Sequence, residues 1–199
     1  MDHKLPVLIG SRAAGILAKL PYDIVVNQFC DYDFIVEENH PLTNIKQHPM
    51  YVLDTTVATT RFHKRILELS TLPECQFHIF YTPLGPAKIP PVLLLMAIYK
   101  SHLHRVQPYH QKQTLDVEKW FRSCIIYNTL RNKVVLDGIV KSFEELDRLL
   151  YDKPTELIRV EHTNFAEIQR TDQLSPIESA VSELYRLGFA DVHARLGDQ

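Results

Sequence analysis

Val7-Leu8-Ile9-Gly10-Ser11-Arg12 is followed, after the length of a helix, by Asp31-Tyr32-Asp33-Phe34-Ile35-Val36. The first stretch predicts a short apolar strand that runs into a Gly-Ser turn and then a helix. The second predicts a strand with two aspartates at alternate positions, and alternate side chains on a strand point to one face. We therefore expect both aspartates to lie side by side, with their aromatic neighbours on the opposite, buried face.

An acidic pair of this kind indicates a cation site. Two carboxylates held close together repel each other. The arrangement becomes favourable when a hard, oxygen-seeking ion such as Mg²⁺ lies between them. The backbone amides of Gly10 and Ser11, at the start of a helix, suit a phosphate group. Phosphoryl and nucleotidyl transfer require this combination of an anion-binding turn and a metal-binding acid pair.

A third carboxylate is expected on a neighbouring strand. The stretch Met50-Tyr51-Val52-Leu53-Asp54 predicts that strand, with Asp54 at its end. Glu74 is the competing acid, but it follows Pro73 in a predicted turn, whereas Asp54 continues an apolar strand.

The composition narrows the class of protein. The chain has 199 residues, of which 45% are apolar and 23% charged, with a formal net charge of -2. This is enough apolar material for a real core, and the charge is unlike that of a globally basic nucleic-acid binder. Cys30, Cys75 and Cys124 are expected to be reduced thiols without a zinc site. The longest apolar run, Val92 to Tyr99, is too short to cross a bilayer, so we expect a cytoplasmic protein with no membrane partner.

The pattern along the chain predicts an α+β fold, with an α+β N-terminal half and a C-terminal helical region. We expect the core at 1–82 and the helical region at 92–199, joined by a stiff proline-rich connection from Thr82 to Pro91. Strands are predicted at 5–9, 31–36, 50–54 and 76–81, with a short strand or turn at 23–26. Helices are predicted at 12–20, 59–69, 92–105, 112–130, 139–151 and 176–187.

Local signals predict where some of these helices begin and end. Ser11 is expected to cap the first helix, and Thr55 or Thr56 the second. Pro176 suits the first turn of the last helix, and Gly188 is placed as its C-terminal cap.

The motif Gly10-Ser11, the pair in Asp31-Tyr32-Asp33 and the later acidic strand resemble the core of the DNA polymerase beta-like nucleotidyltransferase superfamily. The resemblance spans about residues 5–82. The chain continues as Arg12-Ala13-Ala14-Gly15, without a second Gly-Ser pair, and so is similar to the small stand-alone members. The resemblance implies a nucleotidyltransferase-like mixed β-sheet flanked by helices. It also implies two Mg²⁺ ions, with Mn²⁺ as a substitute, and a nucleoside triphosphate such as ATP as the donor.

The same resemblance implies roles for the motif residues. Asp31 and Asp33 would bind both metal ions, and Asp54 would hold the ion nearer the acceptor hydroxyl and take its proton. The amides of Gly10 and Ser11 would bind the β- and γ-phosphates.

A second group of cations follows the proline-rich connection. Arg12 lies beside the Gly-Ser turn, where it would add positive charge for a triphosphate. The stretch Lys100-Ser101-His102-Leu103-His104-Arg105, followed by Lys112 and Asp116, resembles a helical segment of phage and large-virus nucleotidyltransferase-like proteins. That resemblance implies that Lys100, His102 and Lys112 face the nucleotide.

Each of these residues also has an ordinary structural interpretation. Asp31 and Asp33 suit a solvated strand edge that resists aggregation, and Asp54 suits the cap of a following helix. Arg12 suits a helix surface, and cations near a helix C-terminus offset its dipole.

Three functions remain open from the sequence. They are a Mg²⁺-dependent nucleotidyltransferase, an inactive binding or regulatory module of that fold (including one half of a toxin-antitoxin-like pair), and a metal-binding phosphohydrolase. A P-loop, a HExxH zinc site and a GxSxG hydrolase motif are absent from the sequence. The acceptor of a transferase would be a protein hydroxyl, an RNA end or a small molecule.

Overall fold

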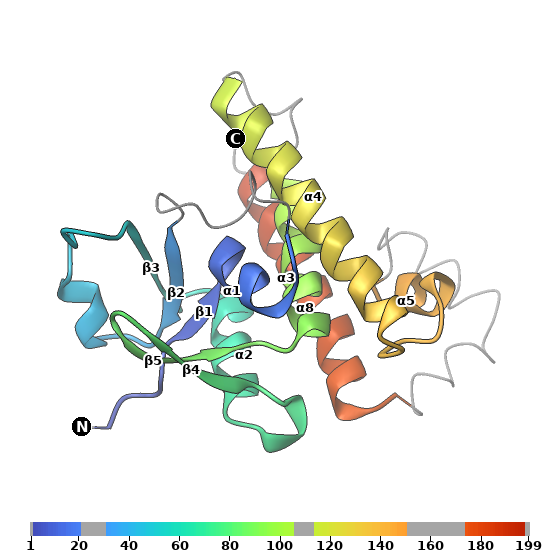
Figure 1. The fold of residues 1–199 in the computed structure, drawn as a ribbon, viewed down its shortest axis with the longest axis horizontal. Coiled ribbons are helices and arrows are strands. Elements are labelled where there is room, and N and C mark those ends of the chain that lie inside the picture. The colour runs from blue at the N-terminus through green and yellow to red at the C-terminus, as the bar shows by residue number, and fades with distance from the viewer. Residues whose placement is uncertain (1, 21–30, 106–113, 151–173, 198–199) are drawn as a thin grey trace.

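The protein has a mixed β-sheet flanked by helices, with a helical region in the C-terminal half of the chain (Figure 1). The computed structural model describes residues 2–20, 31–105, 114–150 and 174–197. The α+β fold class expected from the sequence is confirmed. The expected strand or turn at 23–26 lies outside the described residues.

The sheet has five strands in the order β3-β2-β1-β5-β4. Their bounds are Val7–Ile9 (β1), Tyr32–Val36 (β2), Leu53–Val57 (β3), His78–Thr82 (β4) and Gly85–Ile89 (β5). β1 lies at the centre, antiparallel to β2 and parallel to β5. β2 and β3 are parallel, and β4 and β5 are antiparallel. All of β1 is buried, as its continuous apolar run indicates.

The proline-rich connection expected from Thr82 to Pro91 is wrong, because most of it forms a hairpin turn and β5. Thr82 pairs with Gly85 across a tight turn, and Gly85 has a φ of 110° that favours glycine. Pro86 pairs with Tyr81, and it can do so because alternate pairs of an antiparallel ladder need no hydrogen bond from the proline nitrogen. The sheet therefore continues to Ile89, beyond residue 82.

The helices follow the predicted order with shifted ends. They are Gly10–Leu17 (α1), Arg61–Ser70 (α2), Val92–Arg105 (α3), Thr114–Leu136 (α4), Phe143–Leu150 (α5) and Pro176–Gly197 (α8). Short 3₁₀ helices span Pro41–Asn44 and Pro73–Cys75. Ile139 precedes α5 instead of beginning it and is 47% exposed.

The predicted N-terminal caps are wrong at two helices. Ile9 is the residue before α1, so Ser11 lies within the first turn and caps nothing there. Thr55 and Thr56 belong to β3, and Thr60 caps α2 by accepting a hydrogen bond from the His63 amide at 3.1 Å. The signal for a threonine cap was real, but the strand continues past the first two threonines.

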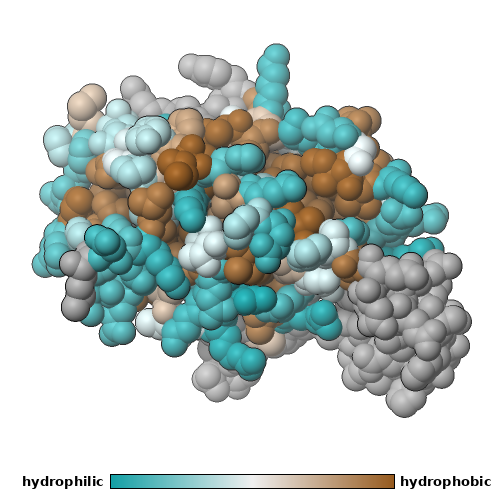
Figure 2. Space-filling model, turned by 90° about the horizontal axis from the view of Figure 1, so that it is seen from below, coloured by the Kyte–Doolittle hydropathy of each residue, from teal (hydrophilic) through white to brown (hydrophobic). Residues whose placement is uncertain are grey.

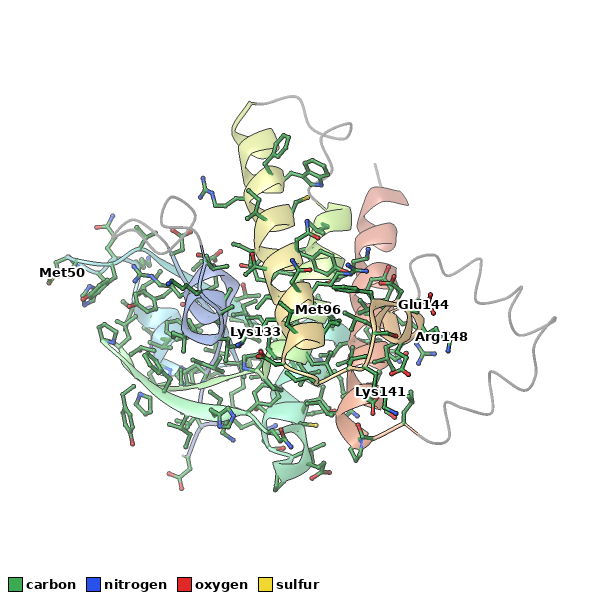
Figure 3. The ribbon with its side chains drawn as sticks, turned by 45° about the vertical axis from the view of Figure 1, so that its right-hand side comes forward. Met50, Met96, Lys133, Lys141, Glu144 and Arg148 are labelled. Carbon is green, nitrogen blue, oxygen red and sulfur yellow. The ribbon has the colours of Figure 1, made fainter. Side chains whose placement is uncertain are left out.

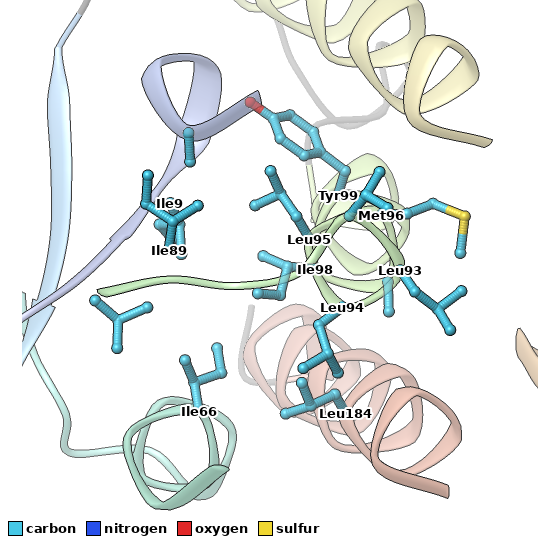
Figure 4. Close-up of a cluster of buried hydrophobic side chains, with 14 of the residues drawn as sticks. Ile9, Ile66, Ile89, Leu93, Leu94, Leu95, Met96, Ile98, Tyr99 and Leu184 are labelled. Carbon is cyan, nitrogen blue, oxygen red and sulfur yellow. The ribbon is translucent and has the colours of Figure 1, made fainter. Parts of the chain in front are cut away.

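The core is centred on α3, whose residues from Val92 to Tyr99 are all buried. Figure 4 shows this helix between strand residues Ile9 and Ile89, Ile66 of α2 and Leu184 of α8. The apolar run is therefore a core helix that joins the sheet to the helical region. No helix among the described residues has the length and apolar character to cross a membrane.

Gly188 lies inside α8, so its predicted role as a C-terminal cap is wrong. A Cβ atom at this position would lie 2.6 Å from the Ser101 Cβ on α3 and 3.1 Å from the Phe62 ring of α2. The glycine is required because it lets α8 approach α3 closely.

α5 packs on the helical region through one face. Its leucines Leu146, Leu149 and Leu150 are buried, while Figure 3 shows Glu144 and Arg148 on the outer side of the helix. The Ser142 hydroxyl accepts a hydrogen bond from the Glu145 amide at 3.2 Å and so caps its first turn. This is an ordinary amphipathic helix of the core.

Candidate metal centre

Three aspartates come together at one end of the paired strands β2 and β3. Asp31 lies directly before β2, Asp33 lies within it, and Asp54 lies on β3 as the register partner of Asp33. One carboxylate oxygen from each residue lies within 4.8 Å of those from the other two. Asp31 and Asp33 share a face because they alternate on the strand, and Asp54 joins them because paired residues of adjacent strands point the same way.

The charge of this group makes it suitable for a divalent cation. Asp31 and Asp54 are exposed, and Asp33 is half-buried. Two unit charges 4.8 Å apart repel by about 0.9 kcal/mol in a water-like medium. All the donors are carboxylate oxygens, the ligands that hard cations such as Mg²⁺ prefer. Among the described residues, no other group of three or more acidic, histidine or cysteine side chains is close enough to hold an ion.

Gly10 brings the start of α1 against Asp33. Its φ is 76°, a conformation that L-residues rarely adopt, and a Cβ atom here would lie 2.0 Å from the Asp33 Oδ2. Only glycine therefore leaves room for the carboxylate. Gly10, the first residue of α1, therefore lies directly against the strand that carries Asp33.

The first turn of α1 has the features of an anion-binding site. Its N-cap residue, Ile9, has no side-chain cap, and the first turn contains no acidic residue. The positive end of the helix dipole thus lies beside Asp33, at the edge of the acidic group. Ser11, which is half-buried, belongs to this turn.

Arg12 is anchored on the same strand that carries the aspartates. Its guanidinium carbon lies 4.4 Å from the centroid of the Tyr32 ring, a cation–π distance. Tyr32 in turn stacks with Phe34 and meets Tyr51 edge-on at 5.4 Å. Sequence reasoning identified Tyr32 only as a buried neighbour of the aspartates. The sequence signal for this cation–π contact was the tyrosine that lies between the two aspartates.

The second group of cations lies on α3. The Lys100 Nζ is 5.3 Å from the ring centroid of Tyr127 on α4, and the His102 ring meets Tyr99 at 6.2 Å. Figure 4 shows the Tyr99 ring pointing from α3 toward α1. Lys112 lies outside the described residues, as does the side chain of Asp116. Contact of Lys100, His102 and Lys112 with a nucleotide stays a prediction.

Glu74, the competing third acid, lies in the 3₁₀ helix Pro73–Cys75 and is not part of the acidic group. The two cysteines of the described residues, Cys75 and Cys124, are free thiols, and burial raises the pKa of each.

Comparison with protein-family models, with curated proteins and with solved structures finds no match to this chain.

Proposed function

We propose that this protein is a Mg²⁺-dependent nucleotidyltransferase of the polymerase beta-like kind, which moves a nucleoside monophosphate from a triphosphate to an acceptor hydroxyl and releases pyrophosphate. One observation carries the proposal. Three carboxylates, carried by β2, by the residue before it and by the adjacent β3, converge within 4.8 Å, directly beside the glycine that begins α1.

Asp31, Asp33 and Asp54 would hold the metal through carboxylate oxygens. Bound Mg²⁺ supplies positive charge that orients the phosphates and stabilises the attacking and leaving oxygens. The backbone amides of the first turn of α1, including those of Gly10 and Ser11, would bind the terminal phosphates of the donor.

Two observations support a role for Asp54 on the acceptor side of the reaction. It lies on β3, an edge strand of the sheet, and its side chain is exposed. An acceptor can therefore approach Asp54 without displacing Asp33, which is half-buried next to Gly10. We assign Asp54 the acceptance of the hydroxyl proton, and Asp31 and Asp33 the binding of the donor through the metal.

The test is a labelling assay with each of the four α-labelled nucleoside triphosphates, with Mg²⁺ or Mn²⁺, and with protein, RNA and small-molecule fractions as acceptors. We expect one fraction to be labelled by the wild type and by Glu74→Gln, the matched control for loss of a carboxylate. Asp33→Asn, which is nearly isosteric, should fold normally and transfer no label.

Label transferred undiminished by Asp33→Asn would refute the proposal. Two other results would replace it with the competing functions. Release of phosphate without a labelled acceptor would indicate a phosphohydrolase. Saturable triphosphate binding with no turnover would indicate a regulatory module that keeps the fold.

A further inference from the structure

β4 forms the edge of the sheet opposite β3. Four of its five residues are exposed, and they include Ile79 at 56%, Phe80 at 39% and Tyr81 at 79%. Figure 2 views the molecule from the side where β4 lies in Figure 1, and apolar residues are exposed there among hydrophilic ones. This strand is the most apolar exposed segment of the sheet.

β4 lacks the features that normally protect an edge strand. Its sequence, His78-Ile79-Phe80-Tyr81-Thr82, contains no lysine, acid or proline, and its pairing with β5 runs through consecutive partners without a bulge. Natural edge strands usually carry such features because an open edge pairs readily with another strand. The opposite edge, β3, carries the charged Asp54.

The register of the hairpin shows which backbone groups face outward. Hydrogen-bonded and non-bonded pairs alternate in an antiparallel ladder, and Pro86 has no N–H to offer Tyr81. The residues of β4 that exchange hydrogen bonds with β5 are therefore Thr82, Phe80 and His78. The N–H and C=O groups of Ile79 and Tyr81 point away from β5. The Lys88 amide, opposite Ile79, correspondingly donates to Pro6 at 2.8 Å, on the far side of β5.

We propose that β4 pairs with β4 of a second copy of this chain, antiparallel, around a two-fold axis through Phe80. In this register Ile79 faces Tyr81 of the second copy, and Tyr81 faces its Ile79. The outward groups of these two residues then form a hydrogen bond in each direction, so the edge is complementary to itself. A two-fold interface demands this reciprocity.

The side chains fit the same register. Each Ile79–Tyr81 pair joins a β-branched and an aromatic residue, and the two Phe80 rings meet at the axis, both favourable cross-strand combinations. No like charges oppose each other, because the only ionisable side chain other than tyrosine on β4 is His78, which faces Thr82 of the second copy. The result is one continuous sheet through both subunits.

This pairing does not depend on the proposed function and leaves the metal centre open. β4 and β2 are separated by three strand spacings, or about 14 Å. The two acidic groups would therefore lie toward opposite ends of the combined sheet.

A charge-exchange test is decisive, because in the proposed register Phe80 is the only residue of β4 that lies opposite the same residue of the second copy. The test is sedimentation velocity of the full chain across a concentration series. Phe80→Lys and Phe80→Glu each place like charges against each other, and each should raise the dimer dissociation constant by about tenfold or more. An equimolar mixture of the two variants should recover a dimer, because lysine then faces glutamate.

Leu136→Lys is the control, because Leu136 is 83% exposed at the end of α4 and lies outside β4. It should dimerise like the wild type. Ile79→Pro removes one outward N–H and no bond to β5, and it should also weaken the dimer.

A wild type that stays monomeric at the highest concentration overturns the proposal. So does a Phe80→Lys or Phe80→Glu variant that is folded and dimerises like the wild type. A mixture of the two folded variants that fails to recover the dimer shows that the axis does not lie at Phe80 and overturns the proposed register.

Discussion

Replacing Asp54 by asparagine should make the metal-free protein more stable while removing its response to Mg²⁺. The carboxylates of Asp31, Asp33 and Asp54 lie within 4.8 Å of one another, so each pair repels by about 0.9 kcal/mol in a water-like medium. Asp54→Asn removes two of the three pairs. Screening at physiological ionic strength roughly halves the sum, which leaves about 1 kcal/mol of relief.

The assay is thermal unfolding in EDTA and in Mg²⁺. For a chain of this length, about 1 kcal/mol corresponds to a rise in Tm of about 2–4 °C for Asp54→Asn in EDTA. Mg²⁺ at ten times its dissociation constant should stabilise the wild type by about 1.4 kcal/mol and Asp54→Asn far less. The order of the two proteins should therefore reverse when Mg²⁺ is added.

Glu74→Gln is the control because Glu74 is an exposed acid outside the acidic group. Its Tm should stay close to that of the wild type in both conditions. If Asp54→Asn loses stability in EDTA, or gains as much from Mg²⁺ as the wild type does, the three carboxylates do not act as one site.

Three further substitutions test other parts of the structure. Gly10→Ala puts a residue with a side chain into a left-handed backbone conformation and against Asp33. It should lower the free energy of unfolding in urea by about 1–3 kcal/mol and abolish stabilisation by Mg²⁺. A folded variant that keeps its response to Mg²⁺ would contradict the close approach of Gly10 to Asp33. Gly188→Ala adds a Cβ atom 2.6 Å from the Ser101 Cβ and should lower the free energy of unfolding by about 1–2 kcal/mol. Helix propensity alone predicts the opposite, a gain in stability. A measured gain would show that α3 and α8 do not lie this close together. Burial, and secondarily the charge of His3, lowers the pKa of His40, so the unfolded chain binds more protons, and stability should fall as the pH drops through about 6.5. His40→Asn keeps an acceptor for the Leu42 amide, and the same stability difference between pH 7.5 and 5.5 in this variant would exclude His40 as the cause.

Local patterns in the sequence predicted much of the site. Alternation on β2 places Asp31 and Asp33 on one face and buries Tyr32 and Phe34, which are 8% and 1% exposed. The continuous apolar run of α3 predicted a buried helix, and the core is centred on it.

The predictions failed where neighbours distant in the chain override local preference. β5 was taken for a connection because Pro86 disfavours a strand, but its position in the ladder makes the missing N–H harmless. Gly188 was taken for a cap because glycine usually ends a helix, but α3 lies against it.

The chain alone thus specified that Asp31 and Asp33 share a face, because strand alternation is a property of one segment. Tertiary structure decided that Asp54 joins them, because this depends on the parallel register of β2 with β3, and a slip of one residue would turn Asp54 to the other face. It also decided that Gly10 lies against Asp33, because the antiparallel pairing of β1 with β2 sets Ile9 opposite Asp33, and a Cβ atom at Gly10 would then lie 2.0 Å from the Asp33 Oδ2.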